Sequence, residues 1–278
     1  MLVGLDRLSA LSDGSPGVTI GLVDGPVDLG QDGLAGAHIH SPADGRGSCS
    51  DLDSPACRHA TFLASLLVGT QDQPPALCRR ARLLVQPVFP GAATARDVAA
   101  AVRAAARGGA HVINLSLTAT AAHGPGDGEL LDALDECLRR DVLVVAAAGN
   151  DSQVGASLIV RHPWVISVGA STEAGFPSAM SNLGSSISRG GLLAPGGGLR
   201  GRGPSGQTMT MGGTSVATVF VTGAAAQLRS LFPRMSGGQV REALIRRGVR
   251  RRSVVPPLLD AWASYLHLSA VSKGDGRG

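Results

Sequence analysis

The sequence has little lysine, few aromatic residues and little charge. Lys273 is the one lysine among 25 basic residues, aromatic residues make up 3% of the 278-residue chain, and charged residues make up 17%. Single-stranded nucleic acids stack their bases on aromatic rings, so this composition offers few platforms for them. No zinc-finger, RNP or phosphate-loop pattern occurs. The net charge is +4, but we expect no nucleic-acid partner.

Long hydrophobic runs are also missing. The longest uncharged stretch is residues 203–228. Its apolar part, residues 216–228, is shorter than the roughly 20 residues that a membrane span needs. Near the amino terminus, Asp6 and Arg7 interrupt the apolar residues before a run of signal-peptide length forms. The sequence therefore predicts no membrane association, and we expect the protein in the cytoplasm.

Cysteine is sparse, and four cysteines are too few for a disulfide scaffold in a chain of this length. Cys49 and Cys57 are close enough in sequence for a loop disulfide, and zinc binding together with His38 or His40 is an alternative. Their spacing matches no standard zinc pattern, and a cytoplasmic location favours free thiols. We expect free thiols here, no metal and no cofactor.

Apolar residues and glycine are abundant by contrast. Hydrophobic residues make up 44% of the chain, which is enough for a large core and excludes a disordered protein. The 39 glycines follow no three-residue period, so they exclude collagen and indicate many tight turns. Short apolar segments alternate with amphipathic or Ala-rich segments. We expect strands at residues 18–23, 82–88, 111–117, 142–147 and 164–168, and helices at residues 58–68, 94–107, 127–140, 215–231, 239–247 and 258–266.

This alternation predicts an α/β fold in which helices cover both faces of a parallel sheet. Within residues 127–140, Leu130, Leu134 and Leu138 are four residues apart, so we expect them to share a buried face. Residues 169–211 are predicted to be mostly loops. No linker or repeat divides the chain, so residues 1–278 are predicted to form a single domain. Its core covers about 17–267, and 269–278 form a disordered tail.

Three residues with hydrolytic potential stand at ends of these segments. Asp24 ends the first strand in VTIGLVDGPVD, His59 begins a helix in RHATFLASLLVG, and Ser215 begins another in GGTSVATVF. In open α/β sheets the reactive groups gather at the carboxyl ends of the strands and at the helix starts beyond them. The imidazole can take the serine proton while the carboxylate orients the ring. The order Asp, His, Ser along the chain is one of the known orders of this triad.

Asn150 adds a candidate donor for an oxyanion. It follows VLVVAAAG at the end of an expected strand, and its amide can donate a hydrogen bond. The backbone N–H of Ser215, at a helix amino terminus, can donate a second one with help from the helix dipole. Both donors suit the tetrahedral intermediate of acyl transfer.

These segments resemble the subtilisin-like serine proteases. The Asp motif of that family is similar to VTIGLVDGPVD, its His-Gly-Thr motif to residues 59–61, its Asn motif to AAAGN, and its Gly-Thr-Ser motif to residues 213–215. The resemblance covers about residues 18–266. It implies a three-layer subtilisin-like fold whose mainly parallel sheet has about seven strands. It also implies that Asp24, His59, Ser215 and Asn150 are catalytic.

The resemblance further implies where a peptide binds. INLSL, residues 113–117, resembles the strand that pairs with the substrate backbone and lines the first specificity pocket, so we expect strand addition along it. The expected substrate-binding residues are Asn114, Leu115, Ser116, Leu117, Thr118, Ala147, Ala148, Gly149 and Thr214. The chain departs from the family at Ala60, Thr118 and Val219, where glycine, glycine and proline are usual. No Asp/Asn-rich loop follows His59, so the tight calcium site of secreted subtilisins is expected to be absent.

Within the family, the chain looks most like the bacterial proteases of cyanobactin-type peptide maturation. The residues that carry this resemblance are DGPVD at 24–28, QPVF at 86–89, and GGAHVIN at 108–114. One type of these enzymes removes the leader from a ribosomally made peptide, and the other cuts the carboxyl side and closes a macrocycle with the help of an added helical element. No insertion of that size is visible, which favours leader cleavage.

Other functions stay open at this point. General intracellular proteolysis, macrocyclisation and a non-catalytic peptide-binding module all fit the same motifs. The basic run RRGVRRR, residues 246–252, is either a solvated helix end or a docking site for an acidic leader peptide or partner protein. A precursor peptide is the expected substrate, and other peptide-maturation enzymes are possible partners.

Overall fold

The computed structural model describes residues 3–42, 45–70, 76–88, 93–117, 124–246 and 253–274. Its main sheet has seven strands, all parallel, in the order β2-β3-β1-β4-β5-β6-β7. The strands are β1 (Thr19–Asp24), β2 (Ile39–His40), β3 (Arg82–Pro87), β4 (Val112–Leu115), β5 (Leu143–Ala147), β6 (Ile166–Ser171) and β7 (Leu192–Pro195). A separate antiparallel hairpin joins β8 (Leu199–Arg202) to β9 (Thr208–Met211).

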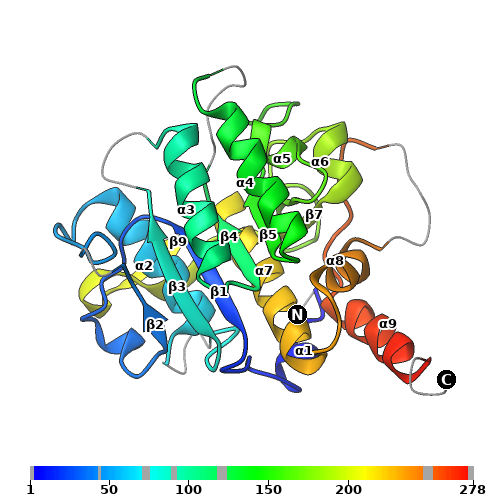
Figure 1. Ribbon diagram of the computed structural model, residues 1–278, viewed down its shortest axis with the longest axis horizontal. Helices are drawn as coiled ribbons and strands as arrows, with labels where there is room; N and C mark the ends of the chain where they lie inside the picture. Colours follow the sequence, from blue (N-terminus) through cyan, green and yellow to red (C-terminus); the bar gives the residue numbers. More distant parts are fainter. Residues whose placement is uncertain are drawn as a thin grey trace.

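Helices cover both faces of the sheet (Figure 1). Those on one face are α3 (Ala95–Arg107), α4 (Asp127–Arg139), α5 (Leu158–Arg161) and α6 (Ser185–Gly190). Those packed toward the other face are α1 (Leu5–Ser9), α2 (Pro55–Val68), α7 (Thr214–Leu231), α8 (Gly237–Ile245) and α9 (Ala261–Gly274). Short 3₁₀ turns, η1 (Asp32–Leu34) and η2 (Pro204–Gly206), complete the elements. The predicted α/β fold is confirmed.

Two hydrophobic clusters form the core, one on each face of the sheet. Strands β4 and β5 are buried at every position, as expected for parallel strands covered on both sides. Successive residues point to opposite faces, so Val112 packs in one cluster and Ile113 in the other. This double coverage explains the continuous apolar runs in the sequence.

The order of the strands places two chain segments next to each other at the carboxyl edge of the sheet. Strand β1 lies between β3 and β4. The chain runs from β1 to β2 and β3 on one side and then crosses to β4 on the other side of β1. Such a switch point leaves a crevice outside the strand ends, where α/β proteins bind their ligands. Asp24 ends β1, and Ser116 directly follows β4. Both residues therefore lie at this crevice.

Several helix starts follow from local capping. Ser54 accepts a hydrogen bond from the Cys57 backbone and Pro55 takes the first helical position, so α2 begins before His59 rather than at it. The expected start at residue 58 was therefore wrong by one turn. Thr94 and Asp97 form a capping box at the start of α3, which confirms the predicted threonine cap.

Other expectations need correction. Leu130 and Leu134 are fully buried, but Leu138 is 45% exposed, because α4 rotates that position past the buried face. Helix α9 continues to Gly274, so residues 269–274 are ordered as helix where a disordered tail was expected. Strand β7 and the β8–β9 hairpin lie in the segment that was expected to be mostly loops. No helix among the described residues is both long and apolar enough to cross a membrane.

Candidate active site

Asp24 and His59 form a directly bonded pair. Asp24 is the last residue of β1 and is 1% exposed, and His59 lies in the second turn of α2. The His59 Nδ1 and Asp24 Oδ1 atoms are 2.8 Å apart. The same carboxylate oxygen accepts the Gly25 backbone N–H at 2.7 Å. A carboxylate on Nδ1 holds the proton of the neutral ring there, which leaves Nε2 as the proton acceptor.

The environment of His59 affects its protonation in opposing ways. Burial lowers the pKa of the imidazole, while the charge of Asp24 and the hydrogen bond to it raise the pKa. The net effect places the pKa of His59 above its ordinary value of 6.5. The His59 side chain still exposes 27% of its surface, so a substrate can reach the ring.

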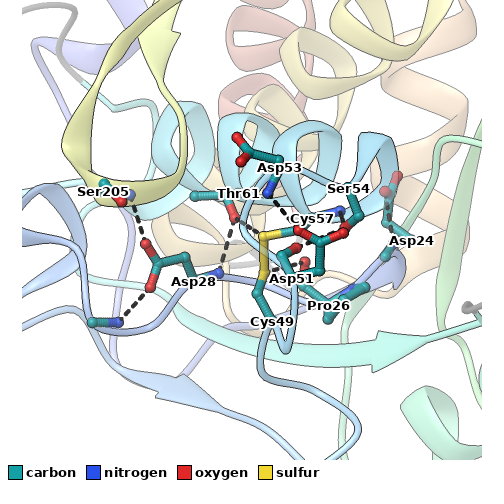
Figure 2. Close-up of a disulfide and its surroundings, with 12 residues drawn as sticks. Asp24, Pro26, Asp28, Cys49, Asp51, Asp53, Ser54, Cys57, Thr61 and Ser205 are labelled. Atoms are coloured by element: carbon teal, nitrogen blue, oxygen red, sulfur yellow. Dashed lines mark hydrogen bonds between the residues drawn. A yellow bond between two sulfur atoms is a disulfide. The ribbon is translucent and has the colours of Figure 1, made fainter.

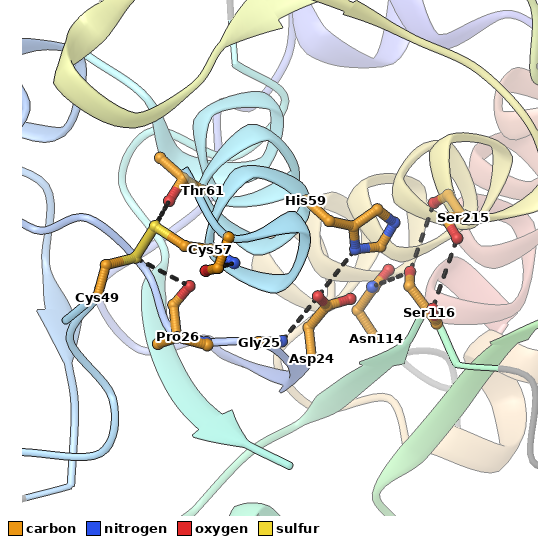
Figure 3. A network of polar contacts seen from close by, with 11 residues as sticks. Asp24, Gly25, Pro26, Cys49, Cys57, His59, Thr61, Asn114, Ser116 and Ser215 are labelled. Atoms are coloured by element: carbon orange, nitrogen blue, oxygen red, sulfur yellow. Dashed lines mark hydrogen bonds and ion pairs between the residues drawn. A yellow bond between two sulfur atoms is a disulfide. The ribbon is translucent and has the colours of Figure 1, made fainter. Parts of the chain in front are cut away.

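Ser215 is the second residue of α7 and lies beside the end of β4 (Figure 3). Its hydroxyl donates a long hydrogen bond of 3.5 Å to the Ser116 carbonyl. In return, the Ser116 hydroxyl donates to the Ser215 carbonyl at 3.5 Å. No hydrogen bond joins Ser215 to His59 among the described residues, although Figure 3 shows both side chains on the same side of the site.

Asn150 is oriented by its own acceptor atom. Its Oδ1 accepts the Thr214 backbone N–H at 2.9 Å and the Thr214 hydroxyl at 3.1 Å. The amide nitrogen is then left as a donor for an incoming group. Gly213 has φ 102°, and a Cβ there would lie 3.0 Å from Asn150 Oδ1. The Gly-Thr-Ser motif therefore needs its glycine both for backbone conformation and for close approach to Asn150.

The amino terminus of α7 supplies a second donor. The N-cap residue, Gly213, has no side chain to cap this helix, and Asn150 Oδ1 accepts the Thr214 N–H from outside it. Ser215 stands in the first turn, where backbone N–H groups have no partner inside the helix. The helix dipole favours negative charge at this end. The Ser215 N–H and the Asn150 amide are thus both placed as donors at this end of α7, and their binding of an oxyanion stays a prediction.

The expected substrate-binding strand is only partly available. Strand β4 pairs with β1 on one side and β5 on the other, and Asn114 and Leu115 are fully buried. The expectation of strand addition along residues 113–115 and of substrate contacts by these two side chains is wrong, because that backbone already forms the sheet. Ser116 and Leu117 lie beyond the ladder and line a cavity. Thr118 lies outside the described residues.

Four further expected substrate contacts are built into the framework. Ala147 pairs with β6, Ala148 N–H donates to Val168, and Gly149 N–H donates to the Thr214 hydroxyl at 3.2 Å. Thr214 is fully buried and holds Asn150. That these residues form the wall of a specificity pocket remains a prediction.

A cavity of about 960 Å³ opens beside the Asp24–His59 pair. Its walls come from β1, the end of β4, Met211 of β9, and the segment that precedes and begins α2. The lining residues include Pro26, Arg46, Ser48, Asp51, Pro55, Ser116, Leu117 and Met211. The sequence patterns did not identify the contribution of residues 45–56 to this cavity. The Ser54-Pro55 pair, a helix-start signal, was the available clue.

Cys49 and Cys57 form a disulfide that ties this segment to α2 (Figure 2). The expectation of free thiols was wrong for this pair. Both sulfurs are committed to each other, so neither is available for zinc with His38 or His40. Cys57 is two residues before His59 in α2, so the bond anchors the helix that carries the candidate base, although residues two apart on a helix do not face each other. Cys78 and Cys137 are free and buried.

Asp28 joins three segments around the disulfide (Figure 2). Its backbone N–H donates to the Thr61 hydroxyl at 2.9 Å, and its carboxylate accepts the N–H groups of Gly30 and Ser205 at 3.0 and 2.7 Å. Asp28, the second aspartate of DGPVD, thus has a structural role, and Thr61 of the His-Ala-Thr motif is one of its hydrogen-bond partners. The remaining departures, Ala60 and Val219, are buried in the core.

Only the first residue of the basic run RRGVRRR is described. Arg246 follows α8, and its guanidinium lies 2.6 Å from His267 Nδ1. Residues 247–252 lie outside the described part of the chain, so the docking role stays a prediction. Among the described residues, no group of three or more His, Cys, Asp or Glu side chains is placed to hold a metal ion.

A carboxylate, an imidazole, a hydroxyl and two N–H donors at one sheet edge are groups that a serine hydrolase uses. The chain belongs to the subtilase family, whose model matches residues 15–257. Subtilisin DY of Bacillus licheniformis is 33% identical over 159 residues, which cover 55% of this chain and 55% of that protein. Subtilisin-like protease 1 of Arthroderma gypseum is 29% identical over 99% of this chain and 58% of that protein. The chain thus spans about half the length of these curated relatives.

Solved structures show similarity over more than nine tenths of the chain. The prenylagaramide maturation protease PagA has a TM-score of 0.83 and 29% identity, covering 95% of this chain and 98% of that one. A point variant of the protease domain of PatA has a TM-score of 0.84 and 30% identity, covering 93% and 97%. The PatG macrocyclase domain shares the fold with a TM-score of 0.82 at 22% identity, covering 94% of both chains.

Proposed function

We propose that the protein hydrolyses peptide bonds through an acyl-enzyme on Ser215. His59 takes the serine proton at Nε2 and later returns it to the leaving amine, while Asp24 holds the ring. Asn150 and the Ser215 N–H stabilise the oxyanion. The observation that carries this proposal is the 2.8 Å hydrogen bond between His59 Nδ1 and Oδ1 of the buried Asp24. The bond joins α2 to the end of β1, at the same edge of the sheet where α7 begins with Ser215 in its first turn.

We propose a precursor peptide as the substrate, cleaved to remove its leader. The support comes from neighbours at 29% identity that are described as maturation proteases for prenylagaramide and patellamide. A cavity beside His59 offers room for side chains next to the scissile bond. Macrocyclisation is the weaker candidate, because the macrocyclase neighbours stand at 22% identity, where similarity supports the fold alone.

One observation favours a second function, a peptide-binding protein without catalysis. The Ser215 hydroxyl bonds the Ser116 carbonyl and not His59. A nucleophile without its base is not activated. Peptide binding with no covalent reaction at Ser215 would support this alternative.

Labelling with a fluorophosphonate probe tests the proposal. Wild-type protein is expected to form a covalent adduct, and Ser215→Ala and His59→Ala are expected to abolish it. Cys78→Ala is a suitable control, since this buried free thiol lies outside the site. Folded wild-type protein that stays unlabelled, by intact-mass measurement, would overturn the acyl-enzyme mechanism and favour the binding protein.

Location and partners are further proposals. A cytoplasmic location fits the sequence composition, whereas the Cys49–Cys57 disulfide argues for an oxidising compartment, because cytosolic thiol buffers keep such bonds reduced. Alkylation of free thiols in intact cells, followed by mass measurement, shows whether Cys49 and Cys57 are oxidised there and so distinguishes the two locations. Co-purification with peptide-maturation enzymes tests the proposed partners.

A further inference from the structure

A chain of hydrogen bonds runs through the core to the candidate nucleophile. The Thr222 hydroxyl donates to Asn114 Oδ1 at 2.8 Å, and Asn114 Nδ2 donates to the Ser116 hydroxyl at 2.9 Å. The Ser116 hydroxyl then donates to the Ser215 carbonyl. Figure 3 shows the part from Asn114 to Ser215. Thr222 and Ser215 both belong to α7, and Asn114 belongs to β4. This series of hydrogen bonds therefore links two points of one helix through the central sheet.

The buried part of this chain is fully enclosed. Thr222 and Asn114 are each 0% exposed, and Ser116 is 7% exposed. A buried amide without partners costs free energy, and an apolar side chain would fill this place in a central strand without that cost. Asn114 has one acceptor and one donor group engaged, and each points to a different element. The amide is therefore suited to fix the end of β4 against α7.

Ser116 transmits that position to Ser215. Because the Ser116 hydroxyl accepts from Asn114, its single proton is directed to the Ser215 carbonyl. The Ser116 carbonyl in turn accepts the Ser215 hydroxyl. A shift of the β4 end would move both contacts of Ser215 together. Displacements of about 1 Å at a reacting group cost up to roughly 10²-fold in rate.

We propose that Asn114 and Thr222 are positioning residues for Ser215 and act through Ser116. They touch neither substrate nor the reacting atoms. The proposal rests on the proposed function, in which Ser215 is the nucleophile. It assigns a role to a buried polar pair that the sequence analysis either took for a substrate contact, as with Asn114, or did not single out, as with Thr222.

Thr222→Val is the informative variant, because valine keeps the shape and removes the hydroxyl. We expect labelling of Ser215 by the fluorophosphonate probe to slow by about tenfold, with kcat reduced and KM little changed for a cleaved peptide. Thr222→Ser restores the hydroxyl and is expected to recover most of the rate. Thr218→Val is the matched control: Thr218 is equally buried one turn earlier, but its hydroxyl bonds the Thr214 carbonyl of its own helix.

Ser116→Ala breaks the other end of the chain and tests coupling. If Thr222→Val and Ser116→Ala interrupt the same series of hydrogen bonds, the variant that carries both changes is labelled no more slowly than the slower single variant. Equal losses in Thr222→Val and Thr218→Val, or independent losses in the double variant, would overturn the positioning role. Those results leave the proposed function intact, since wild-type protein is still labelled. A wild type that is not labelled overturns both proposals. Thermal unfolding of each variant separates rate effects from loss of fold.

Discussion

At the scale of single residues, the protonation of His59 decides when the site can work. Only the neutral ring can accept the Ser215 proton. The buried neighbour Asp24 raises the pKa of His59 by more than burial lowers it, so the pKa lies above 6.5. Activity is therefore expected to be lost on acidification at a higher pH than an unperturbed histidine would give.

This predicts the acid limb of the rate profile. In wild-type protein, kcat/KM is expected to fall with a midpoint above pH 6.5. Asp24→Asn removes the charge that raises the pKa, so the His59 ring is expected to titrate at lower pH while turnover falls by about 10⁴-fold. NMR titration of the ring in a Ser215→Ala background, assigned with His59→Gln, measures the pKa without autolysis. A pKa at or below 6.5 with Asp24 present would contradict the prediction.

The same pKa shift affects stability with the opposite sign. The pKa of His59 is higher in the folded protein than the 6.5 of an unperturbed ring, so the folded state binds the proton more tightly. The stabilisation is complete below pH 6.5 and is lost as the pH rises through the raised pKa. Activity and this part of the stability therefore change in opposite directions over one pH window.

At the scale of elements, the segment before α2 forms one wall of the cavity and is held by local interactions. Residues 45–56 line the cavity beside His59, and the Cys49–Cys57 disulfide anchors them to the helix that carries His59. Ser54 and Pro55 define the start of that helix. The geometry of this cavity wall thus depends on one covalent bond and one helix cap.

Removing the disulfide is expected to destabilise the protein. A bond that closes a loop of this length contributes about 2–3 kcal/mol in the chain-entropy account. The Cys49→Ser/Cys57→Ser double variant should therefore melt several degrees lower by calorimetry. Dithiothreitol should lower the melting temperature of wild-type protein and leave that of the double variant unchanged. A wild-type protein whose melting temperature ignores the reductant would show that the bond contributes nothing.

At the scale of the whole molecule, the last helix closes the fold. The segment before α9 hydrogen-bonds to β7 through Pro257 and Leu259, and Ala261 N–H donates to the Val3 carbonyl. Helix α9 packs on α8 and α1. Figure 1 shows α1, α8 and α9 on the same side of the molecule. The carboxyl-terminal helix is therefore part of the main core and not an appendage.

Two leucines of α9 test that conclusion. Leu268 is 1% exposed and belongs to the core, and Leu266 is 52% exposed on the same helix. Leu268→Ala is expected to lower the free energy of unfolding by about 2–5 kcal/mol, and Leu266→Ala to change it by less than about 0.5 kcal/mol. Urea unfolding measures both. Similar values for the two variants would mean that α9 contributes little to the stability of the fold.

The sequence by itself determined the class of fold and the family. Apolar strands alternating with helices predict a covered parallel sheet, because periodicity and burial are local consequences of composition. Short motifs around Asp24, His59, Asn150 and Ser215 were sufficient for a similar reason: each motif is local, and Asp24 and Ser215 stand at the end of β1 and the start of α7. The helix boundaries were correct to within a few residues wherever a cap was present, as at Thr94.

Only the tertiary structure decided what depends on contacts between distant segments. Strand order showed that Asn114 and Leu115 lie inside the sheet, where their neighbours leave no edge for a substrate. Folding brought Thr222 beside Asn114, across 108 residues of sequence. A contact of this kind depends on how a helix packs on the sheet, which the local sequence pattern does not predict.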